Sequence, residues 1–373
     1  MRRGVIPDWK IKELIQQGII QNADPSLVNT SSLDLRLGLD KWKLLGSFLP
    51  LLGQTVEDAL NLSEISDARD STRERFYIEP IQQYAMRVVE LLDLPQGISA
   101  KVFNKSGRGR IGVSLRGLTD GAPKFDVVDG GYKGPLFAEI CSTSFPLVIN
   151  AGQTAVPQIR FYEGNPEPMS GSELEMLLRN HPILTDDEGR PAYTEAERDN
   201  MIRTGKLVFT ADIHREGLAV YIALRDRRTL DLAKKNHYIP EDFFARVINE
   251  GRKGVLIHPG DFILIKSRQH IRLPPCVAAE IDEYAPECGD MKSSYANLVN
   301  ATHGYDPDHT NTPSALVFEI RARDVPIFIQ HGQRLATFEL YKMLEEPEGR
   351  YMDRKSTDFR DLRSILPNIF KKD

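Results

Sequence analysis

The chain has 373 residues, of which 41% are hydrophobic and 27% charged, with a formal net charge of −5. This composition is that of an ordinary globular protein, which excludes a disordered chain, and the charge gives no general attraction to nucleic acid or anionic membranes. No apolar run is long enough to span a bilayer and the N-terminus lacks the apolar stretch of a signal peptide, so we expect a cytoplasmic protein with no membrane or nucleic-acid partner.

The part of the chain from 1 to 165 has the pattern of a β domain preceded by one helix. A helix is expected over residues 8–17, because Asp8 can cap it and Gly18 can end it. Residues 39–75 are irregular and suggest no function. Short runs of strand composition, separated by Gly, Pro, Asn and Asp turns, occupy residues 32–38, 86–91, 98–103, 136–140, 145–149 and 154–161. This spacing is typical of a β-barrel or sandwich.

The middle of the chain changes character. Ser172-x-x-Glu175 and Thr194-x-x-Glu197 have the pattern of capping boxes and predict a helical linker over residues 166–206. Another helix is predicted over residues 240–250, because Pro240 suits a first turn and Gly251 follows an apolar face.

The second half repeats the first. Pro80 and Pro259 stand at the same offset (259 − 80 = 179) as Pro95 and Pro274 (274 − 95 = 179). LFAEI around Glu139 matches VFEI around Glu319 at nearly the same offset (319 − 139 = 180). We therefore predict a mainly β fold with two β-barrel domains in tandem. The expected units are a first domain at 1–165, the linker at 166–206, a second domain at 207–345 and a tail at 346–373.

A basic turn in the first copy is the strongest candidate for chemistry. Residues 101–116 carry five basic side chains and no acidic one, which suits a phosphate-rich small ligand, although a solvated basic hairpin is the alternative. Ser106 and Arg110 stand four positions apart in this turn. The segment D-x-G-Y-x-G-x-x-x-x-E follows and places Asp129, Tyr132 and Glu139 in a fixed order.

These motifs resemble the dCTP deaminase family of the dUTPase-like superfamily. That family carries a Ser-x-x-x-Arg turn, an Asp-Pro-Gly-aromatic turn and a catalytic glutamate ten positions after the aspartate, the spacing of Asp129 and Glu139 here. SSLDLRLG at 31–38 and QIRF at 158–161 are similar to its first and closing strands. Gly130 stands in place of the family's proline, and the segment between Arg110 and Asp129 is longer.

The resemblance implies zinc-independent hydrolysis of dCTP to dUTP and ammonia, in pyrimidine deoxynucleotide biosynthesis. It implies that Glu139 is the general acid and base, that Ser106 binds the attacking water or the exocyclic amine, and that Arg110 stabilises charge on the base. It also implies Mg²⁺ on the triphosphate and a homotrimer with sites between subunits. The candidate substrate contacts are Lys105, Arg108, Asp129, Tyr132 and Gln158.

Each of these residues has a structural alternative. Glu139 could lie on a solvent face, Lys105 and Arg108 in an exposed basic turn, and Asp129 could cap a turn while Tyr132 packs in the core. The second copy keeps Ser293 and Glu319 but has Asn297 where Arg110 stands. We therefore expect a degenerate second site, in which Glu319 contributes little.

Zinc-dependent deamination is disfavoured by the sequence. The cysteines, Cys141, Cys276 and Cys288, form no Cys-x-x-Cys pair, and His214-x-Glu216 lies near none of them. Their scatter also fits a reducing compartment. The remaining alternatives are a dUTP diphosphatase, a bifunctional dCTP deaminase and diphosphatase, and a non-catalytic nucleotide-binding regulator. The tail favours a deaminase, because it lacks the glycine-rich segment of dUTPases; its Arg350, Tyr351, Arg354 and Lys355 could fold over the triphosphate.

Overall fold

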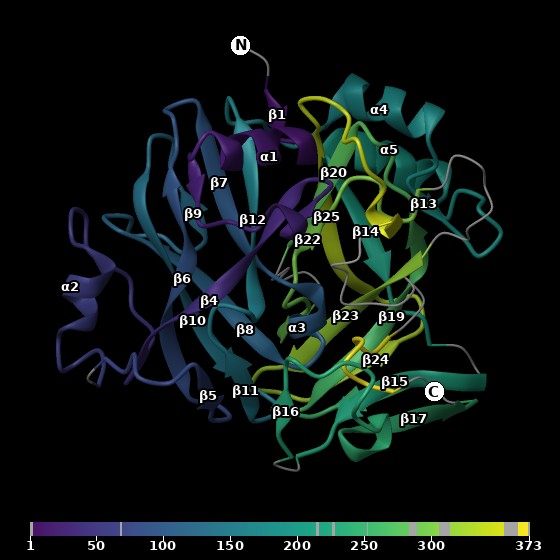
Figure 1. The fold of residues 1–373 in the computed structure, drawn as a ribbon. Coiled ribbons are helices and arrows are strands. Elements are labelled where there is room, and N and C mark those ends of the chain that lie inside the picture. Colours follow the sequence, from purple (N-terminus) through teal and green to yellow (C-terminus); the bar gives the residue numbers. More distant parts are fainter. Residues whose placement is uncertain are drawn as a thin grey trace.

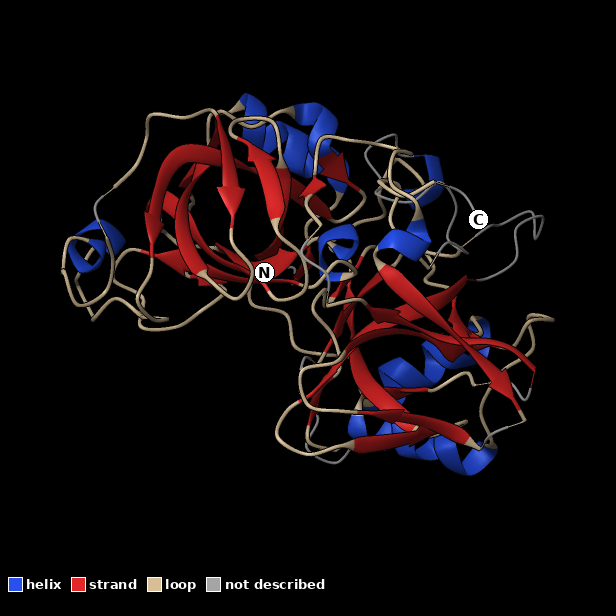
Figure 2. Cartoon of the chain, turned by 90° about the horizontal axis from the view of Figure 1, so that it is seen from below, coloured by secondary structure: helices blue, strands red, loops and turns tan. Residues whose placement is uncertain are grey.

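The computed structural model describes residues 3–67, 69–213, 216–225, 228–251, 253–282, 289–305, 314–353 and 365–371. Two β-barrels lie side by side, one from each half of the chain, with helices at their edges (Figures 1 and 2). The predicted mainly β fold with two tandem barrels is confirmed. Among the described residues, no helix is long and apolar enough to cross a membrane.

The first barrel is built from a large antiparallel sheet and a small second sheet. The strands of the first half are β1 (Gly4–Val5), β2 (Ile20–Gln21), β3 (Val28–Asn29), β4 (Ser32–Lys43), β5 (Arg75–Ile78), β6 (Gln83–Asp93), β7 (Ile98–Asn104), β8 (Val113–Thr119), β9 (Val127–Val128), β10 (Lys133–Ser142), β11 (Leu147–Asn150) and β12 (Ala155–Glu163). Its helices are α1 (Asp8–Gln16), the 3₁₀ turn η1 (Pro25–Leu27), α2 (Val56–Leu60) and α3 (Ser106–Gly109). The large sheet runs β8-β10-β6-β4-β12-β7-β9.

The second half begins with two helices that connect the barrels. These are α4 (Gly171–Asn180) and α5 (Glu195–Thr204), and Thr194 and Glu197 form the predicted capping box of α5. Ser170 rather than Ser172 precedes α4, and no side-chain cap is formed there. The strands are β13 (Leu184–Thr185), β14 (Lys206–Thr210), β15 (Glu216–Ala223), β16 (Leu230–Asp231), β17 (Phe244–Glu250), β18 (Gly254–Ile257), β19 (Phe262–Ile271), β20 (Val277–Ile281), β21 (Met291–Lys292), β22 (Leu298–Val299), β23 (Ser314–Ala322), β24 (Ile327–Gln330) and β25 (Arg334–Lys342). The described residues of this half also form two 3₁₀ turns, η2 (Pro240–Asp242) and η4 (Tyr351–Asp353).

The internal repeat is visible in strand register. The starts of β12 and β25 differ by the offset found in the sequence (334 − 155 = 179), and so do the starts of β5 and β18 (254 − 75 = 179). Glu139 pairs across the sheet with Ala85, and Glu319 pairs with Leu264, which stands at the same offset from Ala85 (264 − 85 = 179). The two halves therefore place Glu139 and Glu319 at equivalent positions of equivalent strands.

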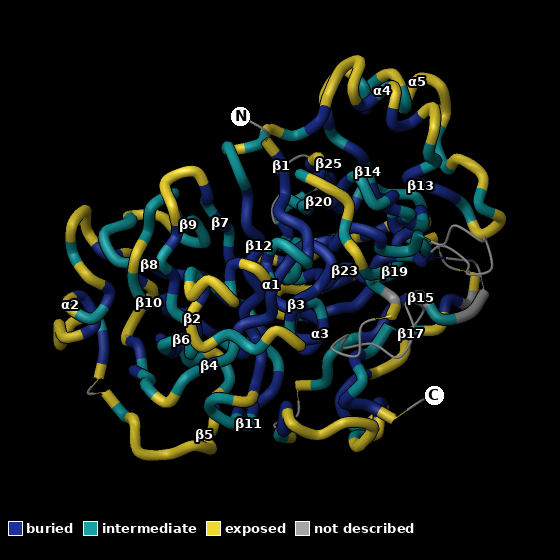
Figure 3. The backbone as a smooth tube through the Cα atoms, turned by 45° about the horizontal axis from the view of Figure 1, so that its top comes forward, coloured by how far each residue is buried: buried dark blue, intermediate teal, exposed yellow. Residues whose placement is uncertain are grey.

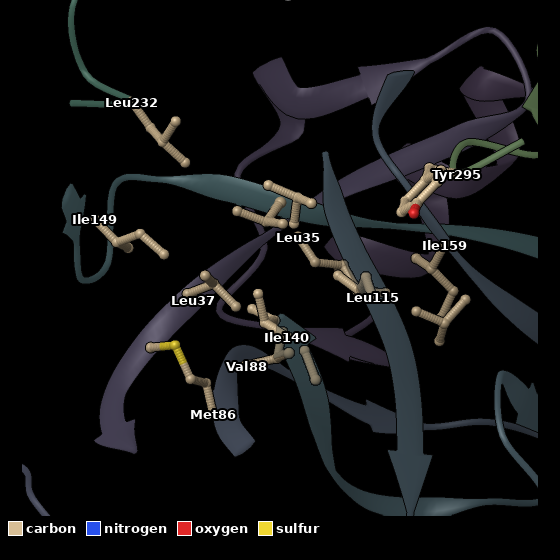
Figure 4. Packing of buried hydrophobic residues seen from close by; sticks show 14 of the residues in the cluster. Leu35, Leu37, Met86, Val88, Leu115, Ile140, Ile149, Ile159, Leu232 and Tyr295 are labelled. Atoms are coloured by element: carbon tan, nitrogen blue, oxygen red, sulfur yellow. The ribbon is translucent and has the colours of Figure 1, made fainter. Parts of the chain in front are cut away.

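The cores of the two halves are joined. Leu35, Met86, Leu115, Ile140 and Ile159 come from five strands of the first barrel and fill its interior (Figure 4). The same cluster takes in residues of the second half, among them Leu232, Phe244, Phe262, Tyr295 and Val317. Burial of this shared apolar surface holds the two halves in one arrangement. Exposed residues lie at the periphery of the molecule, for example around α2, α4 and α5 (Figure 3).

The helix predicted over residues 240–250 was wrong. Only the single turn η2 forms there, and β17 follows it as a strand paired with β15. Phe244 is buried and Ile248 is half exposed, because β17 lies at the edge of its sheet. Pairing with β15 overrides the local apolar pattern, which fits either kind of element.

Candidate active site

Ser106 and Arg110 are held by the one-turn helix α3, which lies between the two barrels (Figure 1). Ser106 opens this turn, and the backbone N–H of Arg110 donates to the Ser106 carbonyl at 3.0 Å. Gly107 and Gly109 are buried within it. The Arg110 side chain is also buried, and its Nη1 donates to the carbonyl of Ile365 at 2.9 Å. The turn therefore presents the first copy's Ser-x-x-x-Arg motif to the second copy.

The carboxylate that faces this turn belongs to Glu319 of β23. A Cβ placed on Gly109 would lie 3.0 Å from Glu319 Oε1 and 3.2 Å from Ala296 Cβ, so the Glu319 carboxylate lies close against the backbone of the turn. Glu319 Oε2 accepts from the backbone N–H of Tyr295 at 3.0 Å. Oε1 is buried and has no hydrogen-bond partner among the described residues. This oxygen therefore has capacity for a further hydrogen bond.

A narrow pocket opens beside the α3 turn, and Glu319 is not among its lining residues. It has about 50 Å³ of free space, and its lining includes Ser106, Arg110, Val317, His303 and Tyr351. Val317 and Glu319 are two positions apart on β23 and therefore lie on the same face of the strand. The pocket thus joins a basic turn of the first copy to the strand of the second copy that carries the buried carboxyl.

Electrostatics suits this carboxyl to proton transfer. Burial raises the pKa of Glu319 to about 7, against the opposing effects of the Tyr295 N–H and the Arg110 charge. Burial, with Arg110 nearby, lowers the pKa of His303 to about 4, so its imidazole is neutral at neutral pH. A carboxyl that gains and loses a proton near pH 7 is the kind of group that general acid–base catalysis uses.

Glu139 has a different set of neighbours. Gln83 Nε2 donates to its Oε1 at 3.3 Å, and Arg116 lies opposite it on β8. Burial raises the pKa of Glu139, while the Ser47 hydroxyl and the backbone N–H of Phe48 lie close enough to lower it. Ser106 and Arg110 do not appear among these contacts. The sequence predicted that Glu139 would lie beside Ser106 and Arg110. Within a single chain, the described contacts of Glu139 are with other residues.

The segment that covers Glu139 lies within residues 39–75, for which the sequence suggested no function. Trp42, Phe48 and Leu60 pack in a small apolar cluster with Phe137 of β10 and Leu118 of β8. Phe137 stands two positions before Glu139 and so shares its face of the strand. This segment, with α2, lies at the outer edge of the first barrel, away from the second half (Figure 1).

Two predicted substrate contacts are engaged in a buried polar network. Lys105 Nζ lies 2.7 Å from Asp34 Oδ2, and Gln158 Nε2 donates to Asp34 Oδ1 at 2.6 Å. Asn29 Nδ2 donates to the same oxygen at 2.9 Å. Arg108 is buried as well and donates through Nε to the Ala155 carbonyl at 3.2 Å. These contacts hold the base of the α3 turn against β4 and β12.

Asp129 and Tyr132 lie on the turn between β9 and β10. Asp129 is exposed, and its carbonyl accepts from the Tyr132 N–H at 3.2 Å. The Tyr132 hydroxyl donates to the Pro135 carbonyl at 2.6 Å and accepts from the Asp120 N–H at 3.2 Å. Neither residue lines the pocket that contains Ser106. In this chain Tyr132 packs at the edge of the core, which is the structural alternative for it.

The second copy's counterparts of the serine turn are buried. Ser293 Oγ and Asn297 Oδ1 have no hydrogen-bond partner among the described residues. The segment Asp306-Pro307-Asp308, whose sequence resembles the aspartate motif of the first copy, falls outside the described residues, as do Arg354 and Lys355 of the tail and His214. Tyr351 of the tail is described and lines the pocket.

His303 was missed as a pocket residue, whereas Tyr351 had been named as a tail residue that could lie over the ligand. Glu319 was expected in a degenerate site, and the structure places its carboxyl next to the α3 turn. One signal for Glu319 was present in the sequence: both copies keep a glutamate at the same strand position, whereas only the first keeps the serine–arginine pair. No comparable signal marks His303, which meets Tyr351 only in the fold.

Comparison with known proteins gives a consistent result over the whole chain. Residues 2–165 match the model of the 2'-deoxycytidine 5'-triphosphate deaminase N-terminal domain, and residues 183–366 match that of its C-terminal domain. The crystal structure of 2'-deoxycytidine 5'-triphosphate deaminase from Agrobacterium tumefaciens is similar with a TM-score of 0.83 and 28% identity, covering 94% of this chain and 98% of that one.

Shorter relatives match about half of the chain. The "dCTP deaminase, dUMP-forming" of Methanoculleus marisnigri is 29% identical over 163 residues, which are 42% of this chain and 80% of the relative. The "dCTP deaminase" of Ignicoccus hospitalis is 25% identical over 191 residues, which are 51% of this chain and 91% of the relative.

Proposed function

The chain belongs to the 2'-deoxycytidine 5'-triphosphate deaminase family, and we propose that it hydrolyses dCTP to dUTP and ammonia at one site formed between its two copies. In this proposal the first copy supplies Ser106 and Arg110, and the second supplies Glu319. The single observation that carries it is the approach of Glu319 Oε1 to Gly109, which puts the second copy's carboxyl against the first copy's basic turn.

The proposed reaction needs one water and one group that relays protons. Ionised Glu319 accepts a proton from water as the oxygen attacks the ring carbon that bears the amino group, and the ring nitrogen receives that proton. A second proton passes from the added hydroxyl through Glu319 to the amino group, which leaves as ammonia while the carbon–oxygen double bond forms. A pKa near 7 suits both directions of transfer, because neither protonation state is strongly favoured.

Arg110 and Ser106 complete the site in this proposal. The Arg110 charge stabilises the negative charge that develops on the base, and its buried position makes that effect larger than it is in water. The Ser106 hydroxyl holds the attacking water or the leaving amine. Magnesium enters as the counter-ion of the substrate's triphosphate, and no protein-bound zinc takes part. A role for Glu139 in a site completed by another chain, and the predicted trimer, stay predictions.

A second candidate product is dUMP. Relatives named dUMP-forming dCTP deaminases match 42% of the chain. In such a reaction deamination is followed by attack of water on the α-phosphate, which releases diphosphate. This version corresponds to the bifunctional alternative.

Product analysis tests these proposals together. The protein is incubated with magnesium and either dCTP or dUTP, and ammonia, dUTP, dUMP and diphosphate are measured. Ammonia in a one-to-one ratio with dUTP supports deamination alone, and ammonia with equal dUMP and diphosphate supports the bifunctional reaction. Release of diphosphate from dUTP without ammonia from dCTP would identify a diphosphatase. No turnover of either nucleotide would favour a nucleotide-binding regulator.

A further inference from the structure

The N-terminal segment is fastened to the C-terminal segment that leads into the pocket. Val5 forms a parallel bridge with Met343, and the Leu344 N–H donates to the Val5 carbonyl at 2.8 Å. A Cβ on Gly4 would lie 2.6 Å from the Leu344 nitrogen, so the two backbones approach as closely as a glycine allows. The two segments lie side by side at the top of the molecule in Figure 1.

Asp8 connects these two segments through hydrogen bonds. It is fully buried at the start of α1, and its Oδ1 accepts from the backbone N–H groups of Trp9 and Glu348, each at 2.9 Å. Its Oδ2 accepts from the Gly349 N–H at 3.3 Å. Trp9 Nε1 adds a bond of 3.2 Å to the Glu346 carbonyl. Hydrogen bonds from backbone N–H groups to a carboxylate are stronger than neutral ones, and α1 directs its positive end at the same charge.

Just beyond the hydrogen bonds of Asp8 with residues 348 and 349, the chain reaches the pocket. The Tyr351 N–H donates to Thr302 Oγ1 at 2.8 Å, and its ring lies 5.1 Å from the His303 ring at an angle of 34°. Both rings line the pocket that contains Ser106 and Arg110. The rings of Tyr351 and His303 form an aromatic wall of the pocket. The position of the chain segment that carries Tyr351 is set by the hydrogen bonds to Thr302 and Asp8.

We propose that Asp8 is a positioning residue for substrate binding, which acts by holding Tyr351 against His303 at the pocket. This inference rests on the proposed function. Asp8 touches no substrate itself; it fixes the segment 348–349 so that the wall is formed before the nucleotide arrives. A wall that is ordered in advance spares the cost of ordering it on binding.

The test compares Asp8→Asn with the parent. This substitution keeps the shape of the side chain but turns one oxygen into a donor, which opposes the Gly349 N–H. We expect the KM and the Kd for dCTP to rise about three- to tenfold, the cost of ordering one or two side chains on binding, with kcat little changed. The Kd is measured by titrating dCTP into the Glu319→Gln background, where turnover does not interfere. Hydrogen exchange across residues 346–353 should become faster in the variant.

Two further variants isolate the mechanism. Glu348→Pro removes the backbone N–H that donates to Asp8 and should reproduce the effect of Asp8→Asn. In a Tyr351→Leu background Asp8→Asn should add little, because the wall is already lost. Asp58→Asn, on the exposed face of α2, is the matched control and should change neither constant.

The outcomes separate this inference from the proposed function. A parent that neither binds nor deaminates dCTP overturns both. A parent that deaminates dCTP, with unchanged KM and Kd in Asp8→Asn and Glu348→Pro, overturns the positioning role alone. A full effect of Asp8→Asn in the Tyr351→Leu background also overturns it, because Asp8 would then act through some other group.

Discussion

Lys101 and Glu280 occupy equivalent positions in the two repeats (280 − 101 = 179) and form a salt bridge with each other, with 2.8 Å between Lys101 Nζ and Glu280 Oε2. Their cross-strand neighbours repeat the pattern: Arg160 lies opposite Lys101, and Glu339 lies opposite Glu280. Identical copies would carry the same charge at these positions and repel each other. Opposite charges therefore favour contact between unlike copies, which is the contact that brings Glu319 to Arg110.

Arg160 is the buried centre of this contact, and its removal should be costly. It is fully buried and donates to the carbonyls of Ala279 and Val299 at 2.9 and 2.8 Å. Arg160→Met leaves these acceptors without a donor and should lower the free energy of unfolding in urea by about 3 kcal/mol. Arg179→Met, which removes an exposed helix pair, should cost about 0.5 kcal/mol or less. Equal effects of the two substitutions would show that the contact does not contribute specially to stability.

The raised pKa of Glu319 predicts a dependence of stability on pH. The folded protein binds this proton more tightly than the unfolded chain, so the contribution of Glu319 to stability falls as pH rises from 4.5 to about 7. The shift corresponds to about 3 kcal/mol. His303 has the opposite effect between pH 4 and 6.5, because its folded pKa is lowered. The difference between parent and Glu319→Gln separates the two groups.

Urea unfolding at pH 5 and pH 8 measures this difference. Glu319→Gln should gain stability relative to the parent on going from pH 5 to pH 8. The exposed Glu13→Gln should show no such gain. A difference between parent and Glu319→Gln that does not change with pH would mean that the carboxyl is not protonated near neutrality in the folded protein.

The absence of zinc ligands in the sequence motifs predicts that deamination survives a strong zinc chelator. Activity lost through chelation of magnesium should return fully when excess magnesium is added. Metal analysis of the purified protein is the independent measurement. One tightly held zinc per chain would overturn the proposed zinc-independent chemistry.

The family resemblance predicts a trimer, whereas the site between the two copies predicts that each chain is active by itself. Sedimentation velocity tests the first expectation, and specific activity measured on dilution through dissociation tests the second. We expect activity per chain to stay constant while the trimer dissociates. A fully active protein that is monomeric at every concentration would refute the trimer. Activity that falls with dissociation would show that chains complete each other's sites.

The sequence predicted the parts of this molecule that depend on local pattern. The constant offset between the paired prolines predicted the repeat, and the register of Glu139 with Ala85 and of Glu319 with Leu264 confirms it. Thr194 and Glu197 correctly predicted the start of α5. The apolar pattern between Pro240 and Gly251 misled, because apolar residues at a helical spacing also suit an edge strand when β15 offers a partner.

The composition of the site could not be read from the sequence in the same way. Ser106 and Glu139 belong to the same set of motifs in the first copy. Those motifs do not indicate whether Ser106 will lie nearer to Glu139 of the first copy or to Glu319 of the second. The answer depends on how two barrels pack, which is set by buried contacts such as Arg160 with Val299. Nothing in the sequence indicated that Ile369 and Phe370, near the end of the tail, are buried in the shared core.

The most direct test of the account is ammonia release from dCTP by Glu319→Gln and Glu139→Gln, each compared with the parent. Both substitutions keep the shape of the side chain and remove a carboxylate, and both glutamates stand at the same strand position. The structure predicts that Glu319→Gln loses at least about a hundredfold in kcat, the scale of general acid–base catalysis. It predicts that Glu139→Gln stays within a few-fold of the parent. An inactive Glu139→Gln beside an active Glu319→Gln would contradict the account and return the catalytic role to the first copy's glutamate.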